Sequence, residues 1–120
     1  MQRDMNLVRE ILLSLEGQST GFAKHPVKID GYEVETIGFH IYLLGEAGLL
    51  ETEDITTYAA KSPQAMPISI TWAGYDFLET SRNQSLWRKA TKTVTDKGLP
   101  LIIDILKPLL IQLAKQELGI

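Results

Sequence analysis

Residues 33–50 read EVETIGFHIYLLGEAGLL, and this stretch joins a helical repeat to a well-marked end. Its aliphatic residues recur at spacings of three, four and three, which places them on one face of a helix: Val34, Ile37, Ile41 and Leu44. Gly48 is the residue type that most often follows a helix. The pattern predicts a helix over residues 33–47 with this one stripe buried.

The residues after this helix favour strands. Leu49, Leu50 and the run Ile55–Tyr58 include β-branched and aromatic types, and the sequence ISI at residues 68–70 alternates as a strand does. Between them, KSPQAMP at residues 61–67 contains two prolines and reads as a loop. We therefore expect two strands joined by a loop.

A first helix is expected over residues 4–16. Asp4 can cap it, Gly17 can end it, and apolar residues recur between them at helical spacing: Met5, Val8, Leu12 and Leu15. The next stretch, GQSTGFAKHPVKIDGY at residues 17–32, is rich in turn-forming residues. It leaves room only for a short strand at Val27–Ile29.

Two more helices are expected after the strands. Thr71 can cap a helix formed by WAGYDFLETSR at residues 72–82, and a further helix should run over residues 85–97 and end at Gly98. The second of these has one apolar side, formed by Leu86, Ala90 and Val94.

The tail at residues 99–120, LPLIIDILKPLLIQLAKQELGI, is the most apolar part of the chain. Pro100 suits a first helical turn, whereas Pro108 should kink or split the helix. One apolar stripe contains Leu99, Ile102, Leu106, Leu109 and Leu113, and a second contains Ile103, Leu110, Ala114 and Leu118. A single domain face cannot bury both stripes, so at least one needs a partner.

We expect that partner to be a second copy of the chain, since a twofold dimer is the commonest closed assembly. The predicted interface consists of Ile102, Leu106, Leu109, Leu110 and Leu113. Charged residues and a proline interrupt the tail, so no transmembrane segment is predicted. Two alternatives stay open: the arm could touch a membrane surface, or it could fold back on its own domain.

Composition is that of an ordinary folded domain of 120 residues, with 44% hydrophobic and 22% charged residues. The absence of cysteine fits a reducing compartment, and MQRDMNLVRE at residues 1–10 lacks the apolar core of a secretory signal. We expect a cytoplasmic protein. Residues 1–80 contain twelve acidic and five basic residues, whereas residues 81–120 contain seven basic and three acidic residues. Such an asymmetry can steer partners.

Three segments together resemble an uncharacterised family of short bacterial and phage-encoded proteins. They are RDMNLVREILLSLE at residues 3–16, GFHIYLLGEAGLL at residues 38–50 and ITWAGYDFLETSR at residues 70–82. The order of helix, LGEAGLLE turn, strand pair and Thr-x-x-Gly helix start also looks like a winged helix. The resemblance implies a winged-helix-type fold and an association with mobile elements, and it supplies no activity and no functional residue.

The expected fold class is therefore α+β: a winged-helix-type domain with a small antiparallel wing and a C-terminal helical arm. We place the domain at residues 1–98 and the arm at residues 99–120, either within the same domain or as an oligomerisation element. One departure from a standard winged helix stands out. A glycine-rich stretch at residues 21–32 replaces the helix that normally precedes the recognition helix.

Residue types argue against DNA binding by the presumed recognition helix at residues 33–47. DNA affinity comes mainly from Lys and Arg on phosphates, and this helix has neither. Its expected outward positions are Glu33, Thr36, His40 and Leu43, with Glu35 and Glu46 on its flanks. Carboxylates there would repel phosphate.

The candidate nucleic-acid contact is instead a basic helix further along the chain, with Arg82, Arg88, Lys89 and Lys92. Trp87 lies in the same helix and could stack on a base, but its apolar neighbours favour core packing. The basic residues themselves are also compatible with a merely solvated face.

No motif for catalysis, metal binding or a cofactor is present. His25 and His40 lack metal-ligand spacing, there is no Gly-x-Ser-x-Gly turn, and the carboxylates are dispersed. We therefore predict no catalytic residue, no metal, no cofactor and no enzyme. The sequence favours a non-catalytic winged-helix-like module for binding and self-association, related to phage or other mobile elements, with an unknown protein partner. The alternative is a DNA-binding transcription regulator.

Overall fold

The first helix begins where Asp4 supplies a cap. In the computed structural model, which describes all residues from 1 to 120, α1 spans Met5–Glu16. The Asp4 carboxylate accepts hydrogen bonds from the backbone N–H groups of Asn6 and Leu7, at 2.9 and 3.2 Å. The apolar residues at helical spacing are buried, as the sequence predicted. The expected first helix is confirmed.

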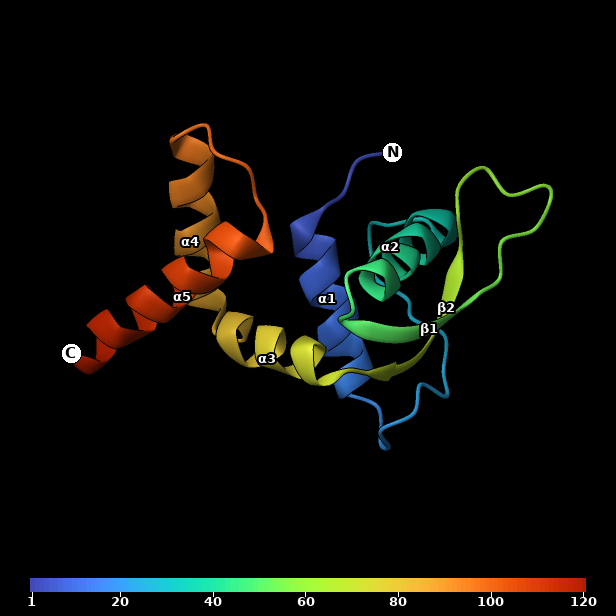
Figure 1. The fold of residues 1–120 in the computed structure, drawn as a ribbon, viewed down its shortest axis with the longest axis horizontal. Helices are drawn as coiled ribbons and strands as arrows, with labels where there is room; N and C mark the ends of the chain where they lie inside the picture. Colours follow the sequence, from blue (N-terminus) through green and yellow to red (C-terminus); the bar gives the residue numbers. More distant parts are fainter. The chain divides into compact units, whose positions relative to one another are not determined.

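Five helices and one two-stranded antiparallel sheet make up the chain, which is therefore an α+β protein (Figure 1). After α1 the elements are α2 (Val34–Glu46), β1 (Leu50–Asp54), β2 (Ala65–Ile70), α3 (Trp72–Ser81), α4 (Gln84–Asp96) and α5 (Ile103–Leu118). They form two compact units, Met1–Asp76 and Phe77–Ile120. This element order is compatible with the expected winged-helix type. A functional division after residue 98 stays a prediction.

In the first unit, α2 packs against α1 and against both strands (Figure 1). Ile37, Ile41 and Leu44 are buried as predicted. Val34 is not: its side chain is 82% exposed, because it is the first residue of α2 and the buried stripe begins one turn later. The stripe prediction was thus correct in the helix body and wrong at its first position.

The Ile41→Ala variant is expected to lose about 2 to 5 kcal/mol of unfolding free energy, because the truncated side chain leaves a cavity in this core. Val34→Ala, on the same helix, is a matched control and should change stability by less than about 0.5 kcal/mol. Urea denaturation followed by circular dichroism measures both. Equal effects of the two substitutions would contradict the placement of α2.

β1 and β2 pair antiparallel, with Leu50 opposite Ile70 and Thr52 opposite Pro67, and the register shifts between Glu51 and Thr52. We call residues 50–70, the two strands and their loop, the wing. The run Ile55–Tyr58, which the sequence assigned to a strand, belongs to the loop. The reason is local: the Asp54 carboxylate accepts a hydrogen bond from the Thr56 N–H at 2.8 Å, which turns the chain out of the ladder.

The two glycine-containing motifs of the sequence contact each other. The Thr71 hydroxyl donates to the carbonyl of Gly48 at 2.6 Å and accepts from the N–H of Gly74 at 3.1 Å, so Thr71 caps α3 as predicted. A Cβ on Gly74 would overlap the carbonyl oxygen of Leu49. Glycine at position 74 therefore allows the start of α3 to lie directly on the turn after α2.

The stretch at residues 17–32 contains neither a helix nor the short strand expected at Val27–Ile29. Its one backbone hydrogen bond to the wing lies before the expected strand: the Ala23 N–H donates to the carbonyl of Ile68 at 2.8 Å. Pro26 has no N–H to donate, so the chain cannot continue such a ladder through it. The strand prediction was wrong, and an isolated contact with β2 takes its place.

The second unit consists of α4 and α5 with the end of α3. Asn83 caps α4 by accepting the N–H of Leu86 at 3.0 Å, and α4 packs against α5, which crosses it (Figure 1). The buried apolar residues of this unit are Phe77, Leu78, Trp87, Ala90, Val94, Leu106, Leu110 and Leu113. Pro100 precedes α5 and is not in its first turn, whereas Pro108 lies inside one continuous helix.

Candidate functional site

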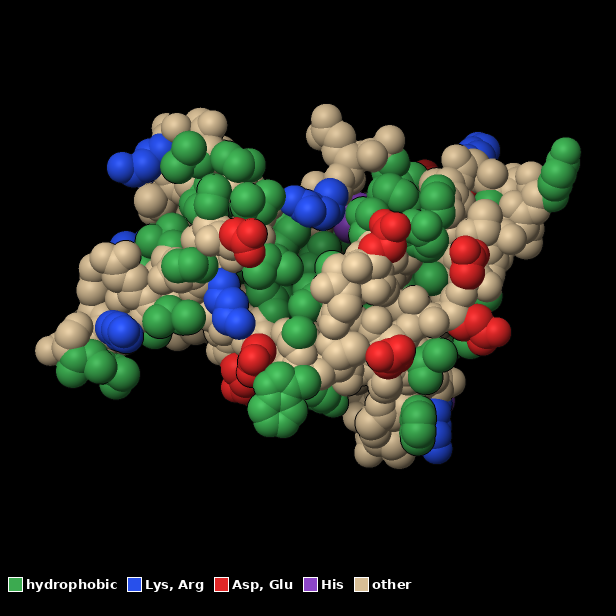
Figure 2. All heavy atoms as spheres, in the orientation of Figure 1, with side chains coloured by type: hydrophobic (Ala, Val, Ile, Leu, Met, Phe, Trp, Pro, Cys, Tyr) green, Lys and Arg blue, Asp and Glu red, His purple; other side chains and the backbone are tan.

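The surface that a winged helix would turn to DNA is formed here by α2 and the wing, and we call it the helix–wing surface. Its exposed acidic residues are Glu33, Glu46, Glu51, Glu53 and Asp54. The single base in this part of the chain is Lys61. Figure 2 shows acidic side chains gathered over α2 and the strands. The surface is thus strongly acidic, as predicted for its helix.

The same surface also exposes apolar side chains. Val34 and Tyr58 are almost completely exposed, and Ile55, Met66 and Ile68 are exposed along the wing. Several large apolar side chains exposed in one region are typical of a surface that contacts another molecule. The helix–wing surface therefore combines carboxylates with apolar groups.

His40 was expected to point outward from α2, and this prediction was wrong. Its side chain is completely buried. Nε2 accepts a hydrogen bond from the backbone N–H of Asp4 at 2.8 Å, and Nδ1 lies 2.8 Å from the carbonyl oxygen of Thr36. Since Nε2 is the acceptor, Nδ1 must donate its proton to Thr36. Both ring nitrogens are occupied inside the protein, so His40 contacts no partner.

Tyr32 extends this network to the segment before α2. Its hydroxyl donates to Oδ2 of Asp4 at 2.8 Å, while Oδ1 of the same carboxylate caps α1. This hydrogen bond raises the pKa of Tyr32 above its ordinary value, and partial burial and the negative charge of Asp4 act in the same direction. Asp4, Tyr32 and His40 together tie the start of α1 to α2.

The raised pKa of Tyr32 predicts a pH effect. A pKa that is higher in the folded than in the unfolded chain contributes stability below the unfolded value of about 10, and this contribution is lost as the pH rises through the folded value. Tyr32→Phe should be about 1 kcal/mol less stable than the parent at neutral pH. Above about pH 10 the difference should shrink. Urea titrations between neutral and alkaline pH test this, and a constant difference would contradict it.

Glu35 binds the wing loop, a role that was not predicted from the sequence. Its carboxylate accepts from the N–H groups of Lys61 and Ser62, at 2.8 and 3.1 Å, and from the Ser62 hydroxyl at 3.3 Å. The Gln64 side chain donates to the Glu35 carbonyl at 2.8 Å and lies where a Cβ on Gly38 would be. The one sequence feature that could have indicated this contact is Gly38, a glycine inside the helical repeat. Glu35 therefore fixes the loop that carries Tyr58.

Of the basic residues predicted from the sequence, Arg88, Lys89 and Lys92 lie on the outer side of α4, and Arg82 lies in the link between α3 and α4. At about 100° per residue, Arg88, Lys89 and Lys92 fall within an arc of about 100°, opposite the buried Trp87 and Val94. All three are exposed. Trp87 is 2% exposed and meets Phe77 edge-to-face at 6.1 Å, so core packing is confirmed and stacking on a base is excluded for the folded chain.

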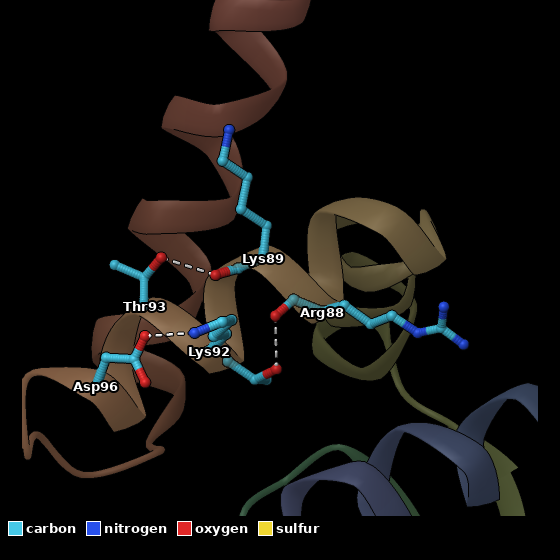
Figure 3. A network of polar contacts seen from close by, with 6 residues as sticks. Arg88, Lys89, Lys92, Thr93 and Asp96 are labelled. Carbon is cyan, nitrogen blue, oxygen red and sulfur yellow. Dashed lines mark hydrogen bonds and ion pairs between the residues drawn. The ribbon is translucent and has the colours of Figure 1, made fainter.

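Two of the four predicted cations are neutralised within the chain. Lys92 pairs with Asp96 at 2.7 Å, which raises the pKa of Lys92, and Arg82 pairs with Glu79 at 2.9 Å. Arg88 and Lys89 are exposed without an ion pair, and their side chains point in different directions (Figure 3). The three cations of α4 share its exposed side but do not converge on a common ligand position (Figure 3).

The residues predicted for a dimer interface fall into two groups. Leu106, Leu110 and Leu113 are buried in the second unit, whereas Ile102 and Leu109 are half-buried. Their place in a contact between two chains stays a prediction. Other apolar side chains of this segment are exposed: Leu99, Ile111, Leu118 and Ile120.

No group of three His, Cys, Asp or Glu side chains is placed to hold a metal ion. His25 lies exposed in the stretch at residues 17–32, where its backbone bonds to the Gln18 side chain. None of the helices combines the length and apolarity needed to cross a membrane.

Fold and surface thus define an α+β protein with an acidic helix–wing surface and a separate basic helix. Residues 2–100 match the model of a family of hypothetical proteins, DUF2513, and the chain belongs to this family. An uncharacterized protein of Haemophilus influenzae is 35% identical over 108 residues, which cover 89% of this chain and 90% of that protein. No solved structure matches. The expected membership of an uncharacterised family is confirmed.

Proposed function

We propose that this chain is a non-catalytic binding module that contacts proteins, a second copy of itself included, and does not read duplex DNA. The observation that carries the proposal is the helix–wing surface, which exposes carboxylates together with apolar side chains and has one lysine as its only base. Phosphates would be repelled there, since DNA binding relies on neutralising them. A basic and apolar protein surface is the complementary partner.

Other features support the same proposal. The first unit contains eleven acidic and five basic residues, and the second contains seven basic and four acidic residues. Such opposite charges favour contacts between copies of the chain. Both ring nitrogens of His40 are used in the core, which leaves no prepared general base there. The proposal also includes a winged-helix-type fold and an origin in mobile elements, both of which rest on the family resemblance. It includes a cytoplasmic location, which rests on the absence of cysteine.

Fluorescence anisotropy with a short mixed-sequence duplex tests the DNA arm. At about 150 mM salt we expect no saturable binding at micromolar protein. At low salt, weak binding should depend on Arg88 and Lys89, so R88A/K89A should remove it while the control K24A/K28A in the first unit should not. Sub-micromolar affinity at about 150 mM salt, lost in Thr36→Ala, would overturn the proposal.

A DNA-binding regulator is the second candidate, because Arg88 and Lys89 are exposed and unpaired in the basic unit. The salt dependence decides between the two. With two phosphate contacts, a plot of log affinity against log salt concentration has a slope of about −2. A site-specific protein typically makes roughly 6–10 phosphate contacts, and its slope is correspondingly steeper. A measured slope steeper than about −5 would favour the second candidate.

A further inference from the structure

α5 has a second side that nothing in its own unit covers. A shallow groove on this side is lined by Ile103, Asp104, Lys107, Pro108, Ile111, Gln112 and Lys115. These residues recur at spacings of three and four, so they share one face of the helix. The groove lies on the side away from Leu106, Leu110 and Leu113, which are buried. α5 is thus partnered on one face only.

The groove has two apolar residues at its centre, flanked by Lys107 and Gln112, and one further charge near each end. Pro108 and Ile111 are exposed in the middle, with Ile111 at 42%. Asp104 and Lys115 are exposed towards the two ends, and neither makes an ion pair within the chain. Eleven residues separate them, about 16 Å along the helix, which is too far for a contact inside one helix.

We propose that a second copy of the chain binds this groove through its own α5, antiparallel, about a twofold axis that passes on the groove side of the helix, at the level midway between positions 109 and 110. The inference rests on the self-association contained in the proposed function. In this register Asp104 faces Lys115 of the second copy, and Pro108 faces Ile111 of the second copy. Lys107 then faces an uncharged residue, Gln112. Every charge at the ends meets its opposite, and the apolar centres meet.

A shifted antiparallel register and a parallel pair of α5 helices would both bring like charges together. An axis at Ile111 would place Lys107 against Lys115 of the second copy, which is a like-charge contact. A parallel pair would place each charged residue against itself, at positions 104, 107 and 115. Like charges held opposite each other weaken association, so the antiparallel register about residues 109 and 110 is favoured over these two arrangements.

The contact is expected to be weak. α5 has 16 residues and is about 24 Å long, and one pair of such helices buries less than the roughly 1,200 Å² of standard stable interfaces. The dimer should therefore form in the micromolar range and exchange with monomer. A weak helix pair is suited to assembly that depends on local concentration.

Charge reversal tests the register in the full chain by sedimentation equilibrium. Asp104→Lys and Lys115→Asp should each weaken the dimer about tenfold, because each turns two attractive contacts into repulsive ones. The double variant should return to within about threefold of the parent. Lys97→Asp, outside the groove with the same charge change as Lys115→Asp, is the control and should have little effect. A double variant weaker than both single variants would overturn the register.

Cross-linking provides a readout that does not depend on reversing charges near helix ends. The chain has no cysteine, so Lys107→Cys and Gln112→Cys each introduce a unique thiol. Mixed under mild oxidation, they should form the 107–112 disulfide between two chains in preference to 107–107 or 112–112 products. No such preference would overturn the register. A parent protein that stays monomeric would overturn the self-association itself, which separates the two failures.

Discussion

Phe77→Ala is expected to lower the free energy of unfolding by about 3 to 5 kcal/mol. Phe77, in the middle of α3, is 1% exposed and meets the buried Trp87 edge-to-face at 6.1 Å. The truncation leaves a cavity and removes the aromatic contact of Trp87. Urea denaturation followed by circular dichroism measures the loss.

Tyr75 provides the matched control, since it is an aromatic residue of the same helix and is 40% exposed. Tyr75→Ala should cost less than about 1 kcal/mol. If Phe77→Ala were as mild as Tyr75→Ala, the core of the second unit would not be built around this aromatic pair.

The second large effect is expected at His40. Replacing His40 with alanine leaves the Asp4 N–H without its acceptor and opens a cavity between α1 and α2, and the two costs together come to about 3 kcal/mol. His40→Gln keeps an acceptor at the end of the side chain and should recover part of the loss. Thermal or urea denaturation measures the series.

His25→Ala is the control for this series, because His25 is exposed and should tolerate alanine within about 0.5 kcal/mol. Equal stabilities of His40→Ala and His25→Ala would mean that His40 faces solvent, as the sequence had suggested. That result would also return His40 to the candidate contact surface.

The helices were predictable because their ends and repeats are local. Asp4, Thr71 and Gly48 act over a few residues, and each has the capping or terminating role expected from its type. His40 was misplaced because one stripe of aliphatic residues predicts one buried face. α2 is instead enclosed by α1 and by both strands, which widens the buried arc to include position 40.

Contacts between distant segments could not be read from the sequence. Ala23 bonds to Ile68, and Glu35 bonds to Lys61 and Ser62, across separations that no short-range pattern encodes. The exposure of the basic α4 residues was predictable from their position opposite an apolar side. The Lys92–Asp96 pair has the spacing of four that helical ion pairs adopt, so neutralisation of Lys92 could have been predicted as well.

Sedimentation of the full chain, alone and mixed with a short duplex at about 150 mM salt, tests the proposed function most directly. We predict that the mass of the chain rises from 13.4 kDa towards twice that value as its concentration increases through the micromolar range. The duplex should sediment as it does alone. A chain that stays at 13.4 kDa throughout, or a duplex that sediments with it, would contradict a protein-binding module that self-associates and does not read DNA.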